Sequence, residues 1–270
     1  MEEKEFLKNY NMKDYERPSV TTDVVVFKVR STKSDNYRQN SGNNLSMLLI
    51  KRGGHPYKDC WALPGGFFQS GETVEECAKR EIFEETKVLP VAIMPVGIFS
   101  TPLRDPRGWI ISCAYASILA SDVNQEAGDD ASDAQWFDIT FDEDDKGNFI
   151  MELVHEDVTL KAVLRETKTE FGRTSFDIKE SGGLAFDHAS IIATALSVLK
   201  YNANDYETIM NFLPEKFTLT QMQNIQETIL NISILPANFR RKVADYVVET
   251  DEFTQGAGHR PAKLYKRKKG

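Results

Sequence analysis

The chain has few cysteines, no long apolar run and no excess of positive charge. Its three cysteines are scattered and odd in number, and no two are spaced as CxxC. This excludes a disulfide framework and a zinc site and predicts reduced thiols. No apolar run approaches the roughly 18 residues of a membrane span, and the opening MEEKEFLKNY is too polar for a secretory signal. We therefore expect a cytoplasmic protein with no membrane partner.

Charge is distributed unevenly along the chain. The net charge of −8 excludes a protein that binds nucleic acid through general positive charge. After position 238, however, nine basic residues outnumber four acidic ones. This asymmetry predicts two parts with different partners.

The spacing of apolar residues divides the chain at a Gly-containing break, KESGGLAFD, at residues 179–187. Before the break, short β-rich runs alternate with polar loops around one helical pattern. The predicted strands cover residues 21–29, 45–53, 91–101, 109–119, 133–139 and 157–180, and residues 60–68 are predicted as a short strand that runs into a Pro-Gly-Gly turn. We predict an α+β chain with a first domain at residues 1–183 and a second at residues 184–270.

The second part has helical spacing throughout its first half. Four helices are predicted, at residues 187–202, 205–214, 218–231 and 235–247. Asp187 is a candidate N-cap for the first of them, and Thr218 or Thr220 for the third. The last helix is basic, and two short β-like runs around a Gly-rich turn follow it. This order is typical of a winged helix.

The helix within GGFFQSGETVEECAKREIFEETKV, residues 65–88, places acids on its apolar side. A helix of about 3.6 residues per turn aligns four core-facing side chains, namely Val74, Cys77, Ala78 and Ile82. Glu81, Glu84 and Glu85 overlap this stripe, whereas a solvated charged face would lie opposite to it. Carboxylates three and four residues apart repel each other. A hard divalent cation such as Mg²⁺ or Mn²⁺ removes that repulsion.

The same stretch resembles the Nudix box, the signature of hydrolases that cleave nucleoside diphosphates linked to another moiety. The family pattern is Gly, five residues, Glu, seven residues, then Arg-Glu-apolar-any-Glu-Glu-any-Gly-apolar. The matching positions here are Gly66, Glu72, Arg80, Glu81, Ile82, Glu84, Glu85 and Val88. Lys87 stands where the family has Gly, and a lysine in a left-handed cap costs about 1 kcal/mol. The loop after Glu85 is therefore expected to differ locally.

The resemblance implies a Nudix fold, a mixed β-sheet sandwiched between helices, and it implies roles for the acids. Glu81, Glu84 and Glu85 would coordinate Mg²⁺ or Mn²⁺, and Arg80 would orient a glutamate. Glu84, Glu85 and Arg80 would thus carry catalysis, in which a water attacks a metal-neutralised pyrophosphate. The sequence leaves the identity of the general base open.

Substrate contacts are predicted beside the box. Gly65 and Gly66 would let the backbone turn close to the site, and Arg52 could reach phosphate. The segment TPLRDPRGW resembles one in ADP-ribose-directed Nudix proteins. Its candidate substrate residues are Arg104, Asp105, Arg107 and Trp109, because arginine binds phosphate bidentately and tryptophan stacks on a base. The alternative is a tight turn with exposed arginines and a core tryptophan.

The C-terminal part resembles that of a Nudix subgroup that includes transcriptional regulators of NAD metabolism, which sense ADP-ribose and bind DNA. The resemblance implies that Asn238 reads a base edge beside basic residues of a recognition helix. Those basic residues are Arg240, Arg241 and Lys242, and His259, Arg260, Lys263 and Lys266 would meet phosphates from the wing. A basic surface for dimerisation or packing is the alternative. A regulator of this kind would be a homodimer on a two-fold operator.

Two functions therefore follow. The first is a Mg²⁺- or Mn²⁺-dependent Nudix pyrophosphohydrolase that acts on a nucleoside-diphosphate compound, with ADP-ribose or a related nucleotide sugar as the expected substrate. The second is a DNA-binding transcriptional regulator whose Nudix domain senses such a nucleotide. The intact set of glutamates favours the enzyme, and the basic C-terminal part favours the regulator.

Overall fold

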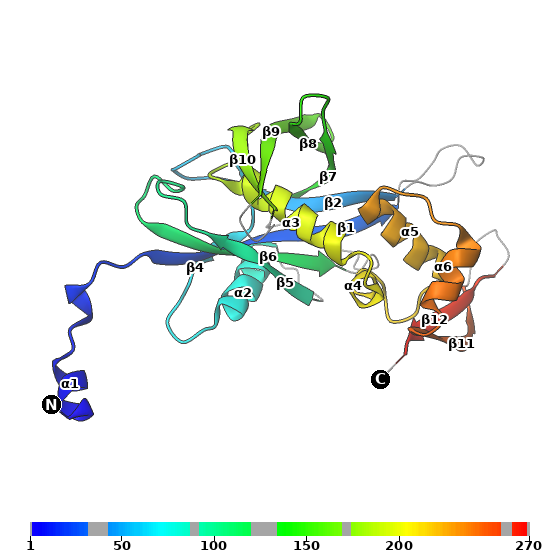
Figure 1. The fold of residues 1–270 in the computed structure, drawn as a ribbon, viewed down its shortest axis with the longest axis horizontal. Coiled ribbons are helices and arrows are strands. Elements are labelled where there is room, and N and C mark those ends of the chain that lie inside the picture. Colours follow the sequence, from blue (N-terminus) through cyan, green and yellow to red (C-terminus); the bar gives the residue numbers. More distant parts are fainter. Residues whose placement is uncertain are drawn as a thin grey trace.

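A large mixed sheet forms most of the N-terminal two thirds of the molecule (Figure 1). The structure, a computed structural model, describes residues 2–31, 43–86, 92–119, 134–168, 174–254 and 261–268. Helix α1 (Glu3–Asn9) and the 3-10 turn η1 (Met12–Asp14) precede the sheet, and α1 lies away from the body of the molecule (Figure 1). No helix in the described ranges is both long and apolar enough to cross a membrane.

The sheet runs in the order β10-β9-β8-β7-β2-β1-β6-β5, with β3 paired to β2 and β4 paired to β1. The strands are β1 (Ser19–Ser31), β2 (Asn43–Lys51), β3 (Trp61–Ala62), β4 (Gly65–Phe67), β5 (Ala92–Phe99), β6 (Ile110–Leu119), β7 (Ala134–Glu143), β8 (Phe149–His155), β9 (Val158–Lys168) and β10 (Thr174–Glu180). Neighbours pair antiparallel except for β1 and β6, which are parallel. A strand lies in every predicted range within the described residues. Gly65 and Gly66, predicted as a turn, belong to β4, and β8 lies where the sequence predicts no strand.

Helices cover both faces of this sheet. Helix α2 (Val74–Thr86) packs on β1 and β4, and Cys77, Ala78 and Ile82 of its predicted apolar stripe are fully buried. Helix α3 (His188–Asn202) covers the opposite face and contacts β10, β5 and β6. The predicted mixed sheet between helices is therefore confirmed.

The C-terminal part is a winged helix. It comprises α4 (Tyr206–Met210), α5 (Leu219–Leu230), α6 (Pro236–Val243) and the antiparallel pair β11 (Val247–Phe253) and β12 (Lys263–Arg267). Of the two candidate caps for α5, the structure uses Thr218, whose hydroxyl accepts from the Gln221 N–H while the Gln221 side chain accepts from the Thr218 N–H. The predicted order of helices and hairpin is confirmed.

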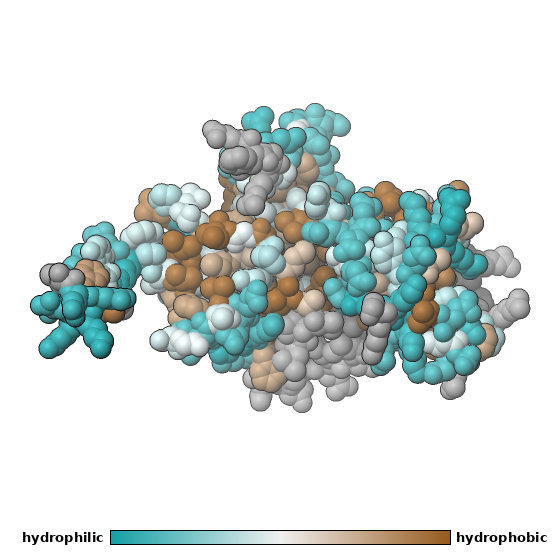
Figure 2. Space-filling view, turned by 60° about the horizontal axis from the view of Figure 1, so that its bottom comes forward, coloured by the Kyte–Doolittle hydropathy of each residue, from teal (hydrophilic) through white to brown (hydrophobic). Residues whose placement is uncertain are grey.

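The two parts share one apolar core. That core runs from β1, β2 and β7 through α3 into α5 and α6. Helix α3 packs on the sheet and also contacts α5, so it belongs physically to both parts, and the boundary between residues 183 and 184 stays a prediction. On the face shown in Figure 2, polar side chains cover much of the C-terminal part, and apolar ones gather on the sheet beside the N-terminal segment.

Candidate active site and nucleic-acid interface

Arg80 organises the acids of α2. Its Nε and Nη2 donate to the two carboxylate oxygens of Glu72 at 3.0 and 2.8 Å. Its Nη1 donates to Glu81 at 2.6 Å and to Glu84 at 3.2 Å. The hydrogen bond from Arg80 is the main reason that the pKa of Glu72 falls to about 2. Arg80 thus lies where it can orient Glu81 and Glu84.

Two glycines bring the backbone against these acids. The Gly65 N–H donates to Glu85 Oε2 at 2.9 Å. A Cβ at Gly66 would collide with the Glu81 carboxylate, and one at Gly65 would collide with the carbonyl of Thr22. Gly65 therefore needs glycine because the Thr22 backbone stands in the way of a Cβ, whereas a Cβ at position 66 would force the Glu81 side chain to move.

Glu85 lies in a concentration of negative charge. Burial raises its pKa to about 8, and the nearby Glu81 and Asp23 carboxylates add to this rise. The Gly65 N–H and the Arg52 guanidinium oppose the rise without cancelling it. By contrast, the Glu84 side chain is 56% exposed. The acids of α2 thus differ in how far water can stabilise their charge.

The acids of α2 fit a divalent cation. In the part of the chain that the structure describes, no three His, Cys, Asp or Glu side chains already form a metal-binding group. Glu81 and Glu84 turn toward Arg80 instead. The available donors are carboxylates, which hard divalent cations prefer. A cation near Glu85 would stabilise the ionised carboxylate, which burial and, to a smaller extent, Glu81 and Asp23 disfavour. Lys87, the departure from the box, lies outside the described residues.

A cavity of about 160 Å³ opens beside Glu85. It gathers every predicted substrate residue except Trp109, namely Arg52, Gly65, Gly66, Arg104, Asp105 and Arg107. Trp109 is 57% exposed and does not line it, so the alternative of a core tryptophan is wrong. Sequence reasoning missed Thr21, Asp23, Ile50, Leu63, Phe67, Phe186 and His188. Of these, Phe186 lies in the KESGGLAFD segment that marks the predicted boundary, and His188 lies in the helix predicted at residues 187–202, so neither was linked to the site.

Two arginines in the cavity pack on Phe186. The guanidinium carbons of Arg52 and Arg107 lie 4.8 and 5.5 Å from the centre of its ring. Arg107 donates through Nε and Nη2 to Asp105. Arg52 donates through Nε to the Pro56 carbonyl at 2.9 Å, and within the described residues its terminal amino groups have no acceptor. This arrangement suits an anion that would bind Arg52 on the cavity side.

The Arg104 side chain is buried and forms ion pairs within the protein. Its side chain is only 4% exposed. Its Nε and Nη2 donate to both oxygens of Asp187 at 2.8 and 2.6 Å, and Nη2 also reaches Asp23 at 3.3 Å. Asp187 occupies the N-cap position of α3 but makes no side-chain cap bond. Asp187 is therefore the N-cap residue, as predicted, but its side chain does not cap α3, because Arg104 binds both of its carboxylate oxygens.

Asp23 and His188 complete this buried network. The His188 Nε2 lies 3.5 Å from Asp23 Oδ1, and the Ser112 hydroxyl donates to Asp23 Oδ2 at 2.5 Å. Burial alone would raise the pKa of Asp23, but His188, Ser112 and Arg104 outweigh it and lower the pKa to about 2. The Leu63 N–H donates to His188 Nδ1 at 2.9 Å. The network therefore ties β1, the loop after β5 and the start of α3 together.

Basic side chains lie on the outside of the winged helix. On α6, Phe239 and Val243 are buried and anchor the helix. The predicted DNA-contacting residues of this helix are exposed, namely Asn238, Arg240, Arg241 and Lys242. On β12, Lys266 is exposed and the Lys263 amino group lies 4.7 Å from the centre of the Phe253 ring. His259 and Arg260 lie outside the described residues.

Two protein families match the chain. The NUDIX domain family matches residues 36–141, and the NrtR DNA-binding winged helix domain family matches residues 209–266. The first match covers the box with its strands, and the second covers α5, α6 and the terminal hairpin. Each match therefore falls on one of the two parts described above.

Individual proteins are similar to one or to both parts. An ADP-ribose pyrophosphatase of Methanocaldococcus jannaschii is 41% identical over 134 residues, which are 49% of this chain and 68% of that protein. The ADPR responsive transcriptional repressor NtrR of Acinetobacter baylyi is 28% identical over 98% of this chain and 88% of its own length. The crystal structure of Shewanella oneidensis NrtR complexed with a 27mer DNA has a TM-score of 0.63 and 26% identity, and covers 92% of this chain and 93% of that one.

Proposed function

The chain belongs to the Nudix family, and from this we propose that it hydrolyses the pyrophosphate of ADP-ribose or of a related nucleotide sugar. One observation carries the proposal. The cavity joins the arginines Arg52 and Arg107 to the buried end of the Nudix box at Glu85. The similarity to an ADP-ribose pyrophosphatase supports this substrate class.

The side chains divide the work as follows. Arg52 and Arg107 bind the phosphates, and the Phe186 ring gives a flat surface beside them. Glu81, Glu84 and Glu85 would hold the divalent cation that Nudix hydrolases use, Mg²⁺ or Mn²⁺. A bound cation there would supply neutralisation of the pyrophosphate charge and activation of a water.

A hydrolysis panel tests the proposal. Purified protein with Mg²⁺ or Mn²⁺ is given ADP-ribose, NAD, dinucleoside polyphosphates and nucleotide sugars, and AMP release is measured. We expect turnover of ADP-ribose that falls at least about 100-fold in Glu85→Gln, because the loss of a residue in the catalytic machinery costs several kcal/mol. Glu75→Gln is the matched control, since Glu75 is an exposed glutamate on the same helix. The proposal fails if no compound is hydrolysed or if Glu85→Gln keeps the wild-type rate.

A second function, DNA binding, rests on a separate observation. The winged helix presents an exposed basic helix, and the matched family and the DNA complex of a relative both concern DNA binding. We propose that the protein is also a DNA-binding regulator, acting as a cytoplasmic homodimer on double-stranded DNA. Asn238, Arg240, Arg241 and Lys242 would enter the major groove, and His259, Arg260, Lys263 and Lys266 would contact phosphates.

A pair of double variants tests the DNA-binding function. Arg240→Ala with Arg241→Ala should abolish the shift of a promoter fragment in a gel while ADP-ribose hydrolysis stays unchanged. Lys161→Ala with Lys168→Ala removes the same charge from β9 and should leave the shift intact, since both lysines are exposed and neither belongs to the winged helix. Equal DNA retention by the first variant and the wild type would remove α6 as the recognition helix.

A further inference from the structure

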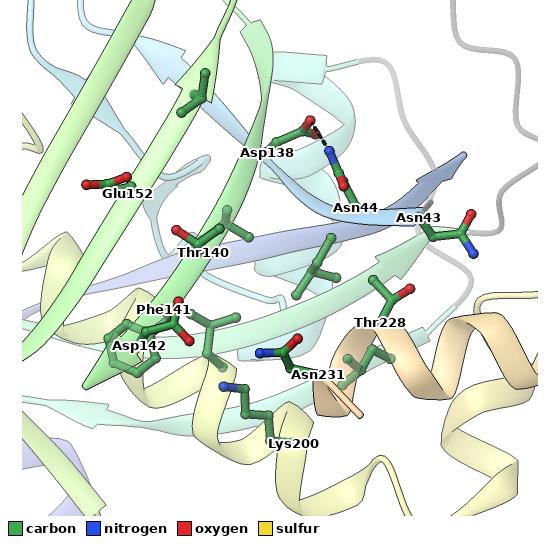
Figure 3. A pocket seen from close by; sticks show the side chains of 15 residues that line it. Asn43, Asn44, Asp138, Thr140, Phe141, Asp142, Glu152, Lys200, Thr228 and Asn231 are labelled. Atoms are coloured by element: carbon green, nitrogen blue, oxygen red, sulfur yellow. Dashed lines mark hydrogen bonds between the residues drawn. The ribbon is translucent and has the colours of Figure 1, made fainter. Parts of the chain in front are cut away.

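A second and larger cavity lies where the sheet meets the winged helix (Figure 3). Its volume is about 490 Å³, within the range of small-molecule sites. β2, β7 and β8 line it on one side, and α3 and α5 line it on the other. It shares no lining residue with the cavity beside Glu85.

The cavity has an apolar floor. The residues that make it are Leu45, Ile139, Phe141, Leu196 and Ile229, and each of them is buried. Such a floor suits an aliphatic or aromatic group of a ligand, because burial of apolar area is the main source of non-directional binding energy. The polar groups around the floor then decide which ligand charge is accepted.

Two of the three carboxylates in the lining already have partners. Asp138 accepts from Ser46 Oγ at 2.5 Å and from Asn44 Nδ2 at 2.8 Å. Glu152 accepts from Lys161 Nζ at 2.7 Å. These acids are therefore satisfied without a ligand, and they would repel a dianion such as a phosphate ester.

Among the described residues that line the cavity, one cationic and one anionic side chain have no polar partner. Across the described ranges, neither the Lys200 ammonium nor the Asp142 carboxylate has a hydrogen bond or ion pair, and the Lys200 amino group lies 5.9 Å from the centre of the Phe141 ring. Figure 3 shows Lys200 and Asn231 directed from the helices toward the strand that carries Thr140 and Asp142. An unpaired ammonium and an unpaired carboxylate thus border one apolar floor.

We propose that this cavity binds a small zwitterion with an apolar side chain, that is, an α-amino acid. Its carboxylate would pair with Lys200 and accept from the Asn231 amide. Its ammonium would pair with Asp142 and donate to the Thr140 hydroxyl, and its side chain would pack on the apolar floor. The inference goes beyond the proposed function, because it concerns a separate ligand class and a separate cavity.

The cavity lies where a bound ligand would contact both the sheet and the winged helix. Thr228 and Asn231 come from α5 and the residue after it, whereas Asp142 and Thr140 come from the sheet. A ligand held between them contacts both parts of the chain. Because a ligand shifts a conformational equilibrium by its differential affinity for the two states, occupancy would bias the placement of the winged helix on the sheet.

Calorimetric titration of the full chain tests the site, with L-phenylalanine and L-leucine as probes. Phenethylamine lacks the carboxylate and 3-phenylpropionate lacks the ammonium, so both should bind at least tenfold more weakly than L-phenylalanine. Lys200→Met should weaken L-phenylalanine at least tenfold. Asp142→Asn should bring the affinities of L-phenylalanine and 3-phenylpropionate together. Lys216→Met is the control, because Lys216 is a surface lysine outside the cavity.

Either of two results would overturn the site. One is the absence of saturable binding of both amino acids at millimolar concentration. The other is equal affinity of the wild type and Lys200→Met. ADP-ribose hydrolysis, measured on the same samples, should be unchanged in Lys200→Met and Asp142→Asn. It therefore separates a failure of this site from a failure of the proposed function.

Discussion

Arg52 and Arg107 share the Phe186 ring but differ in what already binds them. Arg107 is held by Asp105, whereas the terminal amino groups of Arg52 have no acceptor in the described part of the chain. Arg52→Met should therefore raise the KM for ADP-ribose about tenfold or more, with a smaller effect on kcat, since one charge-assisted bond to phosphate is lost. Steady-state kinetics measure this, and Arg52→Lys should recover part of the loss. An unchanged KM in Arg52→Met would remove Arg52 from the phosphate site.

Asp23 gives a prediction about stability and pH. Its pKa falls from the ordinary value of 3.8 to about 2 in the folded protein. A depressed carboxyl pKa contributes stability above the unfolded value, and that stability is lost as pH falls from about 4 toward 2. Asp23→Asn should therefore lower the free energy of unfolding by about 2 kcal/mol at pH 7. Urea unfolding at pH 7 and at pH 3 measures the difference, which should shrink at pH 3; a constant difference would contradict it.

Among individual residues, the sequence predicts proximity only for those that have a fixed local spacing. The box places Gly66, Arg80 and Glu85 within one segment, so their proximity follows from the geometry of one turn and one helix. Phe186 and His188 reach the same cavity from a distant segment, and no local pattern indicates that approach. The sequence could suggest that Arg104 meets a phosphate, but only the tertiary structure shows both Asp187 oxygens bound to it.

Among the helices, strands and loops, the contact between the loop after β5 and the start of α3 makes a measurable contribution to the free energy of unfolding. Arg104 is buried and depends on Asp187 and Asp23 for its neutralisation. Asp187→Asn should lower the free energy of unfolding by about 3 kcal/mol, because breaking a buried pair leaves a charge uncompensated. It should also raise the KM for ADP-ribose, since the same loop carries Arg107.

Chemical unfolding and steady-state kinetics on the same preparation measure both effects. Asp177→Asn is the matched control, because Asp177 is an exposed aspartate on β10. A stability loss in Asp187→Asn no larger than in that control would show that Arg104 does not need this partner. A stability loss without a change in KM would confine Arg104 to a structural role.

Element types were easier to predict than their ends and number. The strands and helices have clear periods, and the Thr218 cap follows from its side-chain chemistry. The helix predicted to continue to residue 214 ends at Met210 instead, since Phe212 and Leu213 turn into the core. β8 was missed because it follows the acidic turn directly, where Asp144 accepts from the Lys146 and Asn148 N–H groups.

In the whole molecule, one continuous core joins the hydrolase part to the winged helix. The network of Asp23, Arg104 and Asp187 reaches from the cavity to the first turn of α3, and α3 in turn packs on α5. A nucleotide in the cavity and DNA on α6 would therefore act on one connected body. If one ligand changes the affinity of the other, linkage requires the reverse change by the same factor.

Hydrolysis should make that coupling transient. If ADP-ribose changes DNA affinity and the protein also cleaves ADP-ribose, the effect must decay as the nucleotide is consumed. We expect fluorescence anisotropy of labelled DNA to return to its starting value with wild-type protein and Mg²⁺. With Glu85→Gln, which should bind ADP-ribose but not cleave it, the change should persist. A persistent change in the wild type, or an equal rate of decay in both proteins, would separate hydrolysis from the control of DNA binding.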